Sequence, residues 1–417
     1  MNKAKLCVLG NGMRAVLAPC EAESVAFGVF VASGSRHEPP KLAGISHFIE
    51  HMLFKGTPTR RPVDITRAIE GRGGNFNACT GEESTCYYAH LPWEYLGEAV
   101  ETLADMYHNA TIPDGEFERE KRVVLEEIKM YDDEPDAVAM ERLQRALFPG
   151  NALGAPVAGS PATLGPMTPG TLRRYIRACY VPAATVAVVA GNFDESAALA
   201  LLELYFGRGR RRAAPPAATP VDFSSRPEPS VSATRDVNQT QLALGYRTFG
   251  LHDPRKYAAT VMDAVLGRGM SSRLFQEVRE KRGLSYDIAS RMQFFDDAGM
   301  FTVAAGLDGR SLPKALATVD RELARIRERR VGAAELKRTK EFLVGNFRLS
   351  HEKVAAKMFF YGATMLSFGR LVTPQEQVDG IAAVTAADVQ AAANAILRAE
   401  NRSLSVVGPA KAGGAAR

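Results

Sequence analysis

The stretch GISHFIEHMLFKG, residues 44–56, decides how the rest of the chain is interpreted. It contains the pattern H-x-x-E-H, formed by His47, Glu50 and His51. Its apolar residues predict a helix that begins near Ser46. Because residues four positions apart share one face of a helix, both imidazoles project to the same side.

Two neighbouring imidazoles with a carboxylate beside them suit a zinc ion. Imidazole nitrogens are common zinc ligands, and a carboxylate can take a proton from metal-bound water. The order of these residues is that of the inverzincin signature, the reverse of H-E-x-x-H. The alternative is a pair of half-buried helix histidines beside a solvated glutamate, so the motif needs structural context.

Two histidines leave zinc short of a protein ligand, which another element must supply. Residues 117–133, FEREKRVVLEEIKMYDD, predict a helix with two adjacent glutamates. Glu126 has Arg122 and Lys129 at helical spacing, which indicates a charged, solvated face. The neighbours of Glu127 are apolar: Val123, Val124, Met130 and Tyr131. A carboxylate on an apolar face must be paired or metal-bound, so we predict Glu127 as the ligand. An ion pair with an arginine elsewhere is the alternative.

Glu120 lies seven residues before Glu127, on the same predicted helix face. A carboxylate in that position can orient a ligating histidine by binding its second ring nitrogen.

Length and composition set the broad class of protein. The chain has 417 residues, 46% hydrophobic and 24% charged, which is usual for a soluble globular protein. This length predicts at least two domains. The first residues, MNKAKLCVLGNGM, lack the apolar run of a signal peptide, and no stretch is long enough to span a membrane. We therefore expect a cytoplasmic protein without a membrane partner.

Cysteine usage and charge add two expectations. The five cysteines are scattered and lack C-x-x-C spacing, which is typical of reduced thiols in a reducing compartment. The net charge is +5, but much of the excess lies in the arginine-rich residues 208–212. A solvated linker explains this run better than a nucleic-acid surface, so we expect no nucleic-acid partner.

Apolar patterning predicts the secondary structure. Strands are expected at residues 5–19, 24–33 and 185–191, and a strand or hairpin at 76–91. Helices are expected at 63–70, 94–109, 115–131, 140–147 and 169–179. Residues 207–229, rich in Arg, Ala and Pro, predict an interdomain linker.

The second half of the chain repeats the order of the first. ALGYRTFG resembles the earlier AFGVFVASG, and SLSVVG resembles the earlier TVAVVAG. Gly28 to Gly245 and Gly191 to Gly408 are both shifts of 217 residues (245 − 28 and 408 − 191). Equal shifts predict a duplicated α+β domain.

The expected fold is therefore two homologous domains, each a mostly antiparallel β-sheet packed against α-helices. The N-terminal domain is expected at residues 1–206 and the C-terminal domain at 230–417. The H-x-x-E-H pattern occurs only in the first half. We therefore expect one copy to bind metal and the other to lack the site.

With these segments in place, the chain resembles the pitrilysin-type zinc peptidases, in the branch similar to mitochondrial processing peptidase. The resemblance covers essentially the whole chain, with these segments in the expected order: HFIEHMLFKGT, GGNFNACT, VVLEEI and SSRLFQEVREKRGLSY. It implies zinc ligands at His47, His51 and Glu127. It also implies a general base at Glu50 and an outer carboxylate at Glu120.

The resemblance further implies residues that contact substrate. GGNFNACT is similar to an edge strand that binds substrate through backbone groups near Asn77 and Ala78, since an unpaired edge can add an extended peptide. Arg279 and Tyr286 match a pair near the substrate carbonyl, where a cation and a phenol can stabilise an oxyanion. The alternatives are an ordinary edge strand, and a surface helix that ends at Gly283 before a strand.

Full-length pitrilysin-type enzymes have four such domains around a closed chamber, whereas this chain supplies two. The resemblance therefore implies a homodimer with two composite sites, in which Arg279 and Tyr286 of one chain complete the zinc site of the other. Some relatives divide these features between different subunits, so a heterodimer is the alternative. This chain carries both features, which favours the homodimer.

The predicted reaction is zinc-dependent hydrolysis of flexible peptides, with Glu50 as general base. Zinc, rather than manganese or cobalt, follows from the ligand types and the resemblance. One alternative is a non-catalytic assembly or scaffold subunit, although such relatives typically lose part of the metal motif. Another is a processing peptidase dedicated to one pathway. Several acidic residues either favour basic peptides or are solvated loop charges: Glu82, Glu83, Asp132, Asp133, Glu134 and Asp136.

Overall fold

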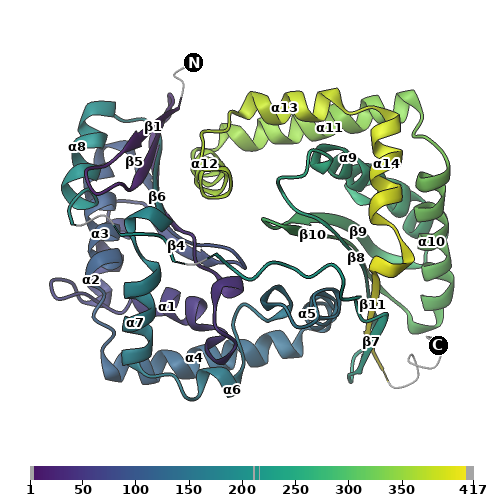
Figure 1. The fold of residues 1–417 in the computed structure, drawn as a ribbon, viewed down its shortest axis with the longest axis horizontal. Helices are drawn as coiled ribbons and strands as arrows, with labels where there is room; N and C mark the ends of the chain where they lie inside the picture. Colours follow the sequence, from purple (N-terminus) through teal and green to yellow (C-terminus); the bar gives the residue numbers. More distant parts are fainter. Residues whose placement is uncertain (1–3, 210–211, 216, 410–417) are drawn as a thin grey trace. The chain divides into compact units, whose positions relative to one another are not determined.

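The computed structural model describes residues 4–209, 212–215 and 217–409, which form two compact units. The first unit contains the described residues up to Ile128, those within Pro156–Thr219, and Arg348–Thr373. The second contains Lys129–Ala155, Pro220–Phe347 and the described residues from Pro374 onward. Each unit combines one β-sheet with helices (Figure 1), so the predicted α+β fold class is confirmed. Among the described residues, no helix has the length and apolar character needed to cross a membrane.

A six-stranded sheet forms the centre of the first unit, in the order β1-β2-β6-β3-β5-β4. Its strands are β1 (Lys5–Val8), β2 (Arg14–Pro19), β3 (Ser24–Val31), β4 (Asn75–Thr80), β5 (Thr85–Pro92) and β6 (Thr185–Gly191). Strands β2 and β6 pair in parallel, and the other neighbours are antiparallel. The segment predicted as an edge strand, β4, does lie at the edge of this sheet.

Helices cover both faces of this sheet, because successive side chains of a strand point to opposite sides. In β3, Phe27 and Val29 contribute to one apolar cluster, whereas Ala26 and Phe30 contribute to the other. The first cluster is completed mainly by α1 (Ile45–Leu53), α2 (Pro62–Glu70), α3 (Leu96–Asn109), α4 (Asp114–Asp133), α6 (Pro161–Leu164), α7 (Pro169–Cys179) and α8 (Glu195–Tyr205). The second is completed by α12 (Val354–Phe368).

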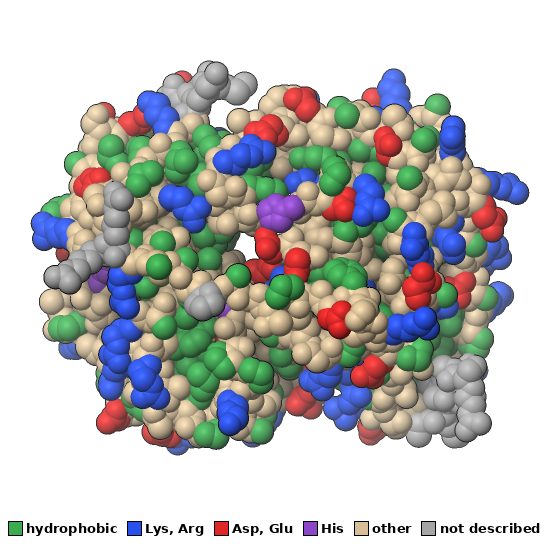
Figure 2. All heavy atoms as spheres, in the orientation of Figure 1, with side chains coloured by type: hydrophobic (Ala, Val, Ile, Leu, Met, Phe, Trp, Pro, Cys, Tyr) green, Lys and Arg blue, Asp and Glu red, His purple; other side chains and the backbone are tan. Residues whose placement is uncertain are grey.

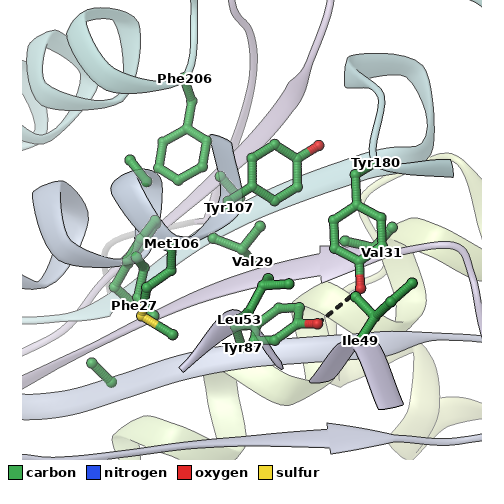
Figure 3. Packing of buried hydrophobic residues seen from close by; sticks show 14 of the residues in the cluster. Phe27, Val29, Val31, Ile49, Leu53, Tyr87, Met106, Tyr107, Tyr180 and Phe206 are labelled. Atoms are coloured by element: carbon green, nitrogen blue, oxygen red, sulfur yellow. Dashed lines mark hydrogen bonds between the residues drawn. The ribbon is translucent and has the colours of Figure 1, made fainter. Parts of the chain in front are cut away.

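Figure 3 shows how the core of the first unit holds α1. Ile49 and Leu53 of this helix are fully buried in the same cluster as the residues of β3. Burying a side chain of this size stabilises the fold by about 1.5–3 kcal/mol. The hydroxyl groups of Tyr87 and Tyr180 hydrogen-bond to each other at 2.8 Å within this core. The apolar side of α1 is therefore anchored, and its other side is free to carry polar groups.

A five-stranded sheet forms the centre of the second unit, in the order β7-β11-β8-β10-β9. Its strands are β7 (Ser230–Thr234), β8 (Thr240–Phe249), β9 (Ser285–Phe294), β10 (Ala298–Leu307) and β11 (Arg402–Gly408). The remaining helices are α5 (Pro135–Leu147), α9 (Lys256–Gly267), α10 (Leu312–Glu328), α11 (Ala333–Glu352), α13 (Pro374–Ala383) and α14 (Ala386–Ile396). Side chains of α9, α10 and α14 share one cluster with this sheet, and α5 shares the other.

Apart from the additional strand β1 in the first, the two sheets have the same topology, which confirms the predicted duplication. The order β2-β6-β3-β5-β4 corresponds to β7-β11-β8-β10-β9. In both, the first pair is parallel and the following pairs are antiparallel. The predicted shift of 217 residues carries β6, Thr185–Gly191, onto β11, Arg402–Gly408.

The compact units combine segments from both halves of the chain, and the domain bounds expected at residues 1–206 and 230–417 stay a prediction. Helix α5 comes from the first half but packs on β8 and β11, and α12 comes from the second half but packs on β3 and β6. Apolar periodicity predicts that a helix is buried on one face, but it does not say which sheet the helix covers. Of the predicted linker 207–229, residues 210, 211 and 216 lie outside the described residues, and its described residues have neither helical nor strand structure.

Other differences are local. Residues 5–19 form two strands rather than one, because the chain reverses at Gly12, whose φ of 87° suits glycine. The amide of Gly12 donates a hydrogen bond to the carbonyl oxygen of Leu9 in this turn. The helix predicted at residues 140–147 begins earlier, at Pro135, a favourable residue for a first helical turn.

Gly28 and Gly245, the glycines related by the shift of 217 residues, leave room for α12 and α5. These are the two helices that pack on the sheet of the other half of the chain. A Cβ atom at Gly28 would lie 2.7 Å from Sδ of Met358 in α12. A Cβ atom at Gly245 would lie 2.8 Å from Cδ1 of Leu147 in α5. Close-packed interiors do not tolerate such short contacts, so a side chain at either position must displace the helix side chain that it meets.

We expect Gly28→Val and Gly245→Val each to lower the free energy of unfolding by about 1–3 kcal/mol, the usual cost of overpacking a core. Urea unfolding followed by circular dichroism measures the effect as a lower midpoint. Gly97→Ala in α3 is the matched control, because a Cβ there meets no atom within 4 Å. An equal loss in the control would contradict the proposed role of the two glycines.

Candidate metal centre

The start of α1 is held by a glycine and a buried carboxylate. Gly44 caps the helix with a φ of 94°, in the region that favours glycine. The carboxylate of Glu38 accepts hydrogen bonds from the backbone amides of Gly44 and Ser46, both at 2.7 Å. A carboxylate here satisfies amides that have no partner within the helix and complements the helix dipole. Burial raises the pKa of Glu38, while these hydrogen bonds act to lower it.

His47 and His51 project from the same side of α1, as their spacing predicted. Their ring centroids are 4.8 Å apart, and both side chains are partly buried. Burial is the main reason that the pKa of His47 is lowered, with a further contribution from the neighbouring His51. A lowered pKa favours the neutral imidazole, which is the form that binds metal ions.

Glu127 of α4 completes a cluster with the two histidines. Its Oε2 atom lies 3.7 Å from Nε2 of His47 and 3.4 Å from Nε2 of His51. All three ligand atoms lie within 4.8 Å of one another. Tetrahedral zinc with bonds of about 2.0–2.2 Å separates neighbouring ligand atoms by about 3.3–3.6 Å. The donor set and its spacing therefore fit a zinc ion.

Glu127, the predicted ligand, does reach this cluster, but the apolar face expected around it is largely exposed. Glu126 is exposed, as its charged neighbours indicated. Val124 is buried, whereas the other supposed apolar neighbours of Glu127 are 43–50% exposed: Val123, Met130 and Tyr131. Glu127 therefore does not lie on a buried apolar face. Its position beside two imidazoles is the feature that explains a carboxylate there.

Glu120 lies about two helical turns before Glu127 in α4 and contacts His51 of the cluster. Its Oε2 atom lies 3.2 Å from Nδ1 of His51, and its Oε1 atom lies 2.6 Å from Nζ of Lys55. Glu120 is buried, so these contacts compensate a charge that would be costly alone. A hydrogen bond from Nδ1 fixes the orientation of the His51 ring and leaves Nε2 for a metal ion.

We expect Glu120→Gln to weaken zinc binding by about 10–100-fold, the usual cost of losing an outer partner of a ligating histidine. Competition with a chromophoric chelator measures the zinc dissociation constant. Glu118→Gln is the matched control, because Glu118 is exposed on the same helix. Unchanged affinity in Glu120→Gln would rule out an orienting role.

Glu50 lies on the same helix as the two histidines and contacts the edge strand. The hydroxyl group of Thr80, in β4, donates a hydrogen bond to the Glu50 carboxylate. Burial raises the pKa of Glu50, and the Thr80 hydrogen bond and His51 oppose that shift. A carboxylate of raised pKa is a better proton acceptor near neutral pH. Thr80 was not predicted as a site residue. Because side chains alternate along β4, Thr80 shares a face of the strand with Phe76 and Ala78, and this is the face that α1 covers.

The predicted substrate strand exposes Asn77 and partly buries Ala78. The amide of Ala78 donates a hydrogen bond to Oδ1 of Asn77 at 2.8 Å. The amide of Gly81 bonds to the carbonyl oxygen of Ser84, and hydrogen-bonded pairs alternate along an antiparallel pair of strands, so the amide of Ala78 points to the open edge of the sheet. An edge amide of this kind can pair with the backbone of an added strand. Substrate contacts at Asn77 and Ala78 remain a prediction.

Arg279 and Tyr286 lie together in the second unit. Arg279 is in a π-helical turn, η6 (Phe275–Glu280), and Tyr286 is in β9. The Arg279 guanidinium lies 5.2 Å from the centre of the Tyr286 ring, which is 80% exposed. Gly283, with a φ of 58°, ends the turn between them. Both the predicted pair and the simpler helix-stop pattern are therefore present, and the catalytic role of the pair remains a prediction.

The acidic residues considered for substrate preference are not equivalent. Glu83 forms an ion pair with the buried Arg36 at 2.6 Å, so it has a structural partner. Asp132, Asp133 and Glu134 are exposed. On the face shown in Figure 2, Lys and Arg side chains are interspersed with acidic and uncharged ones. Preference for basic peptides and lack of a nucleic-acid partner both stay predictions.

The H-x-x-E-H motif of α1 is the signature of the inverzincin class, and here a glutamate from a second helix lies beside it. Comparison with known families shows that the chain belongs to the insulinase family of peptidases, family M16. Residues 15–160 match the model for that family, and residues 166–343 match the model described as the M16 inactive domain. The resemblance to pitrilysin-type peptidases is thereby confirmed.

Similar proteins extend over nearly the full length of the chain. An uncharacterized zinc protease of Bacillus subtilis is 35% identical and covers 96% of this chain and 97% of its own length. One of Mycobacterium tuberculosis is 38% identical and covers 96% of this chain and 92% of its own. The crystal structure of a Helicobacter pylori protease has a TM-score of 0.92 at 20% identity, covering 98% and 99%. The last of these shows similarity of fold alone.

Proposed function

We propose that this chain is a zinc-dependent endopeptidase that hydrolyses flexible peptides. The observation that carries the proposal is the convergence of His47, His51 and Glu127 beside Glu50. The open edge of β4 is next to this group, because Thr80 of that strand bonds to Glu50. Family membership and relatives named zinc proteases support the same reaction class.

Each residue has a distinct part in the proposed reaction. A zinc ion held by the two histidines and Glu127 would supply a Lewis acid and a water of lowered pKa. Glu50 accepts the proton of the attacking water and delivers it to the leaving amine. The open edge of β4 holds the peptide in an extended conformation near Asn77 and Ala78. Glu120 keeps the His51 ring oriented.

Cleavage of an unstructured peptide of about twenty residues tests the proposal, because a strand-edge site binds extended chains. Purified protein is assayed as isolated, after chelation and after zinc is restored. Loss on chelation and recovery with zinc are the expected results. Failure of a zinc-loaded homodimer to cleave any peptide of a diverse library would favour the non-catalytic scaffold instead.

We further propose a cytoplasmic homodimer in which Arg279 and Tyr286 of one chain complete the zinc site of the other. The presence of both the metal motif and the Arg–Tyr pair in one chain supports this arrangement. The guanidinium and the phenol donate hydrogen bonds to the oxyanion of the hydrolysis reaction.

Mixing two inactive variants tests the composite site. We expect Glu50→Gln and Tyr286→Phe chains, unfolded and refolded together, to recover about a quarter of the wild-type activity, because half of the dimers are mixed and each contains one intact site. Peptide cleavage is measured against each variant refolded alone. Absence of recovery in dimers shown to be mixed by mass would overturn the shared site.

A further inference from the structure

Two of the five cysteines lie opposite each other at the edge of the first sheet. Cys79 is in β4 and Cys86 is in β5, and the two are register partners in the antiparallel pair. Opposed residues on antiparallel strands have Cα atoms about 4.5–5.5 Å apart. A disulfide spans Cα separations of about 4.4–6.8 Å. The backbone therefore already places these thiols at a distance that a disulfide can bridge.

The reduced thiols are not equivalent. Cys79 is exposed, and Cys86 is buried. A hydrogen bond with the Cys86 thiol lowers the pKa of Cys79, whereas burial raises the pKa of Cys86 well above its usual value. An exposed thiol with a lowered pKa is the one that peroxides oxidise first. A second thiol directly across the strand pair can then resolve the oxidised sulfur.

Cys79 also lies between two residues of the candidate site. The amide of Ala78 points to the open edge, and the hydroxyl of Thr80 holds Glu50. Ala78 packs with the core beneath α1, whereas Cys86 belongs to the cluster that contains α12. Because side chains alternate along a strand, a bond at Cys79 forms on the face away from Glu50 while constraining the backbone on either side.

We propose that Cys79 and Cys86 form a reversible disulfide that weakens peptide binding at β4. Hydrogen peroxide or an organic hydroperoxide is the oxidant. The Cys79 sulfur attacks a peroxide oxygen, so an S–O bond forms, the O–O bond breaks and water or an alcohol leaves. The Cys86 sulfur then attacks the sulfenic sulfur, so the S–S bond forms, the S–O bond breaks and water leaves. Two thiols lose two electrons, and one peroxide gains them.

The consequence for peptides follows from the role of an edge strand. In the reduced state, the contacts described between β4 and β5 are noncovalent: backbone hydrogen bonds and the thiol contact. Strand β4 can therefore adjust its twist when a further strand is added. A covalent bond at Cys79 removes that freedom beside Ala78. This effect on peptides rests on the proposed function, whereas formation of the disulfide does not.

The test treats full-length protein with hydrogen peroxide, alkylates the remaining thiols and maps disulfide-linked peptides by mass spectrometry. A linked pair of peptides containing Cys79 and Cys86 is expected, and a dithiol reductant should abolish it. Peptide cleavage is followed in the same samples. We expect KM to rise about fivefold on oxidation, comparable to the loss of one peptide hydrogen bond, and to return on reduction.

Cys79→Ser and Cys86→Ser should each prevent the link and the reversible change in KM. Cys179→Ser, which removes a buried cysteine of α7, should leave both intact. Oxidation of Cys79 to sulfenic or sulfinic acid without a link to Cys86 would overturn the disulfide. A complete link with unchanged KM would overturn its effect on binding. If reduced protein cleaves no peptide, the proposed function fails, and the peptide map still decides whether the disulfide forms.

Discussion

Glu50→Gln is expected to lower kcat/KM for peptide cleavage by about 10²–10⁴-fold, the range that general acid–base catalysis supplies. Glutamine keeps the shape of the side chain and can still accept the Thr80 hydrogen bond, but it cannot take a proton from water. The helix core is unaffected, because the buried residues of α1 are unchanged. Peptide cleavage and zinc content are measured on the same preparation.

Zinc content separates a catalytic defect from a folding defect. Glu50→Gln should bind as much zinc as wild type, because Glu50 is not one of the three converging ligands. Glu126→Gln, an exposed position next to Glu127, is the matched control and should retain full activity. Activity within a few-fold of wild type in zinc-loaded Glu50→Gln would remove this residue from the reaction.

Glu127→Gln is expected to reduce both zinc binding and activity. An amide oxygen is a weaker ligand than a carboxylate, and the neutral side chain no longer balances the charge of the ion. The loss of affinity should exceed the roughly 10–100-fold cost of an outer partner such as Glu120. Isothermal titration or competition with a chromophoric chelator measures it.

Thermal unfolding gives a second readout that does not need substrate. A metal that binds only the folded state stabilises it by about 2.7 kcal/mol at 100 times its dissociation constant. Zinc at that concentration should therefore raise the Tm of wild type and Glu126→Gln, and should have little effect on Glu127→Gln. Equal zinc-induced shifts in all three proteins would place the metal elsewhere.

The site motif was predictable because its geometry is local. His47, Glu50 and His51 occupy one helix, so their relative positions follow from helical periodicity alone. The duplication could also be predicted, because Gly28 and Gly245 occupy matching positions in the two sheets. At each position a helix side chain packs too closely to leave room for a Cβ atom. Glu127 lies beside the two histidines, although the apolar face that the sequence predicts around it is largely exposed.

Other features depend on contacts between residues distant in sequence. Thr80 reaches Glu50, and Lys55 pairs with Glu120, only because separate elements pack against one another. The opposition of Cys79 and Cys86 depends on the register of a hairpin, and a shift of one residue would place the two side chains on opposite faces. Cysteine spacing alone could not reveal this pair.

The sequence by itself determined the α+β class, the repeated order of elements and the metal-motif helix, because these follow from periodicity and from residue chemistry within short segments. The tertiary structure alone decided which sheet each helix covers. Helices α5 and α12 each bury apolar residues, and each packs on the sheet of the other half of the chain. The hydrophobic effect is non-directional, so an apolar pattern predicts that a helix face is buried but not which sheet buries it.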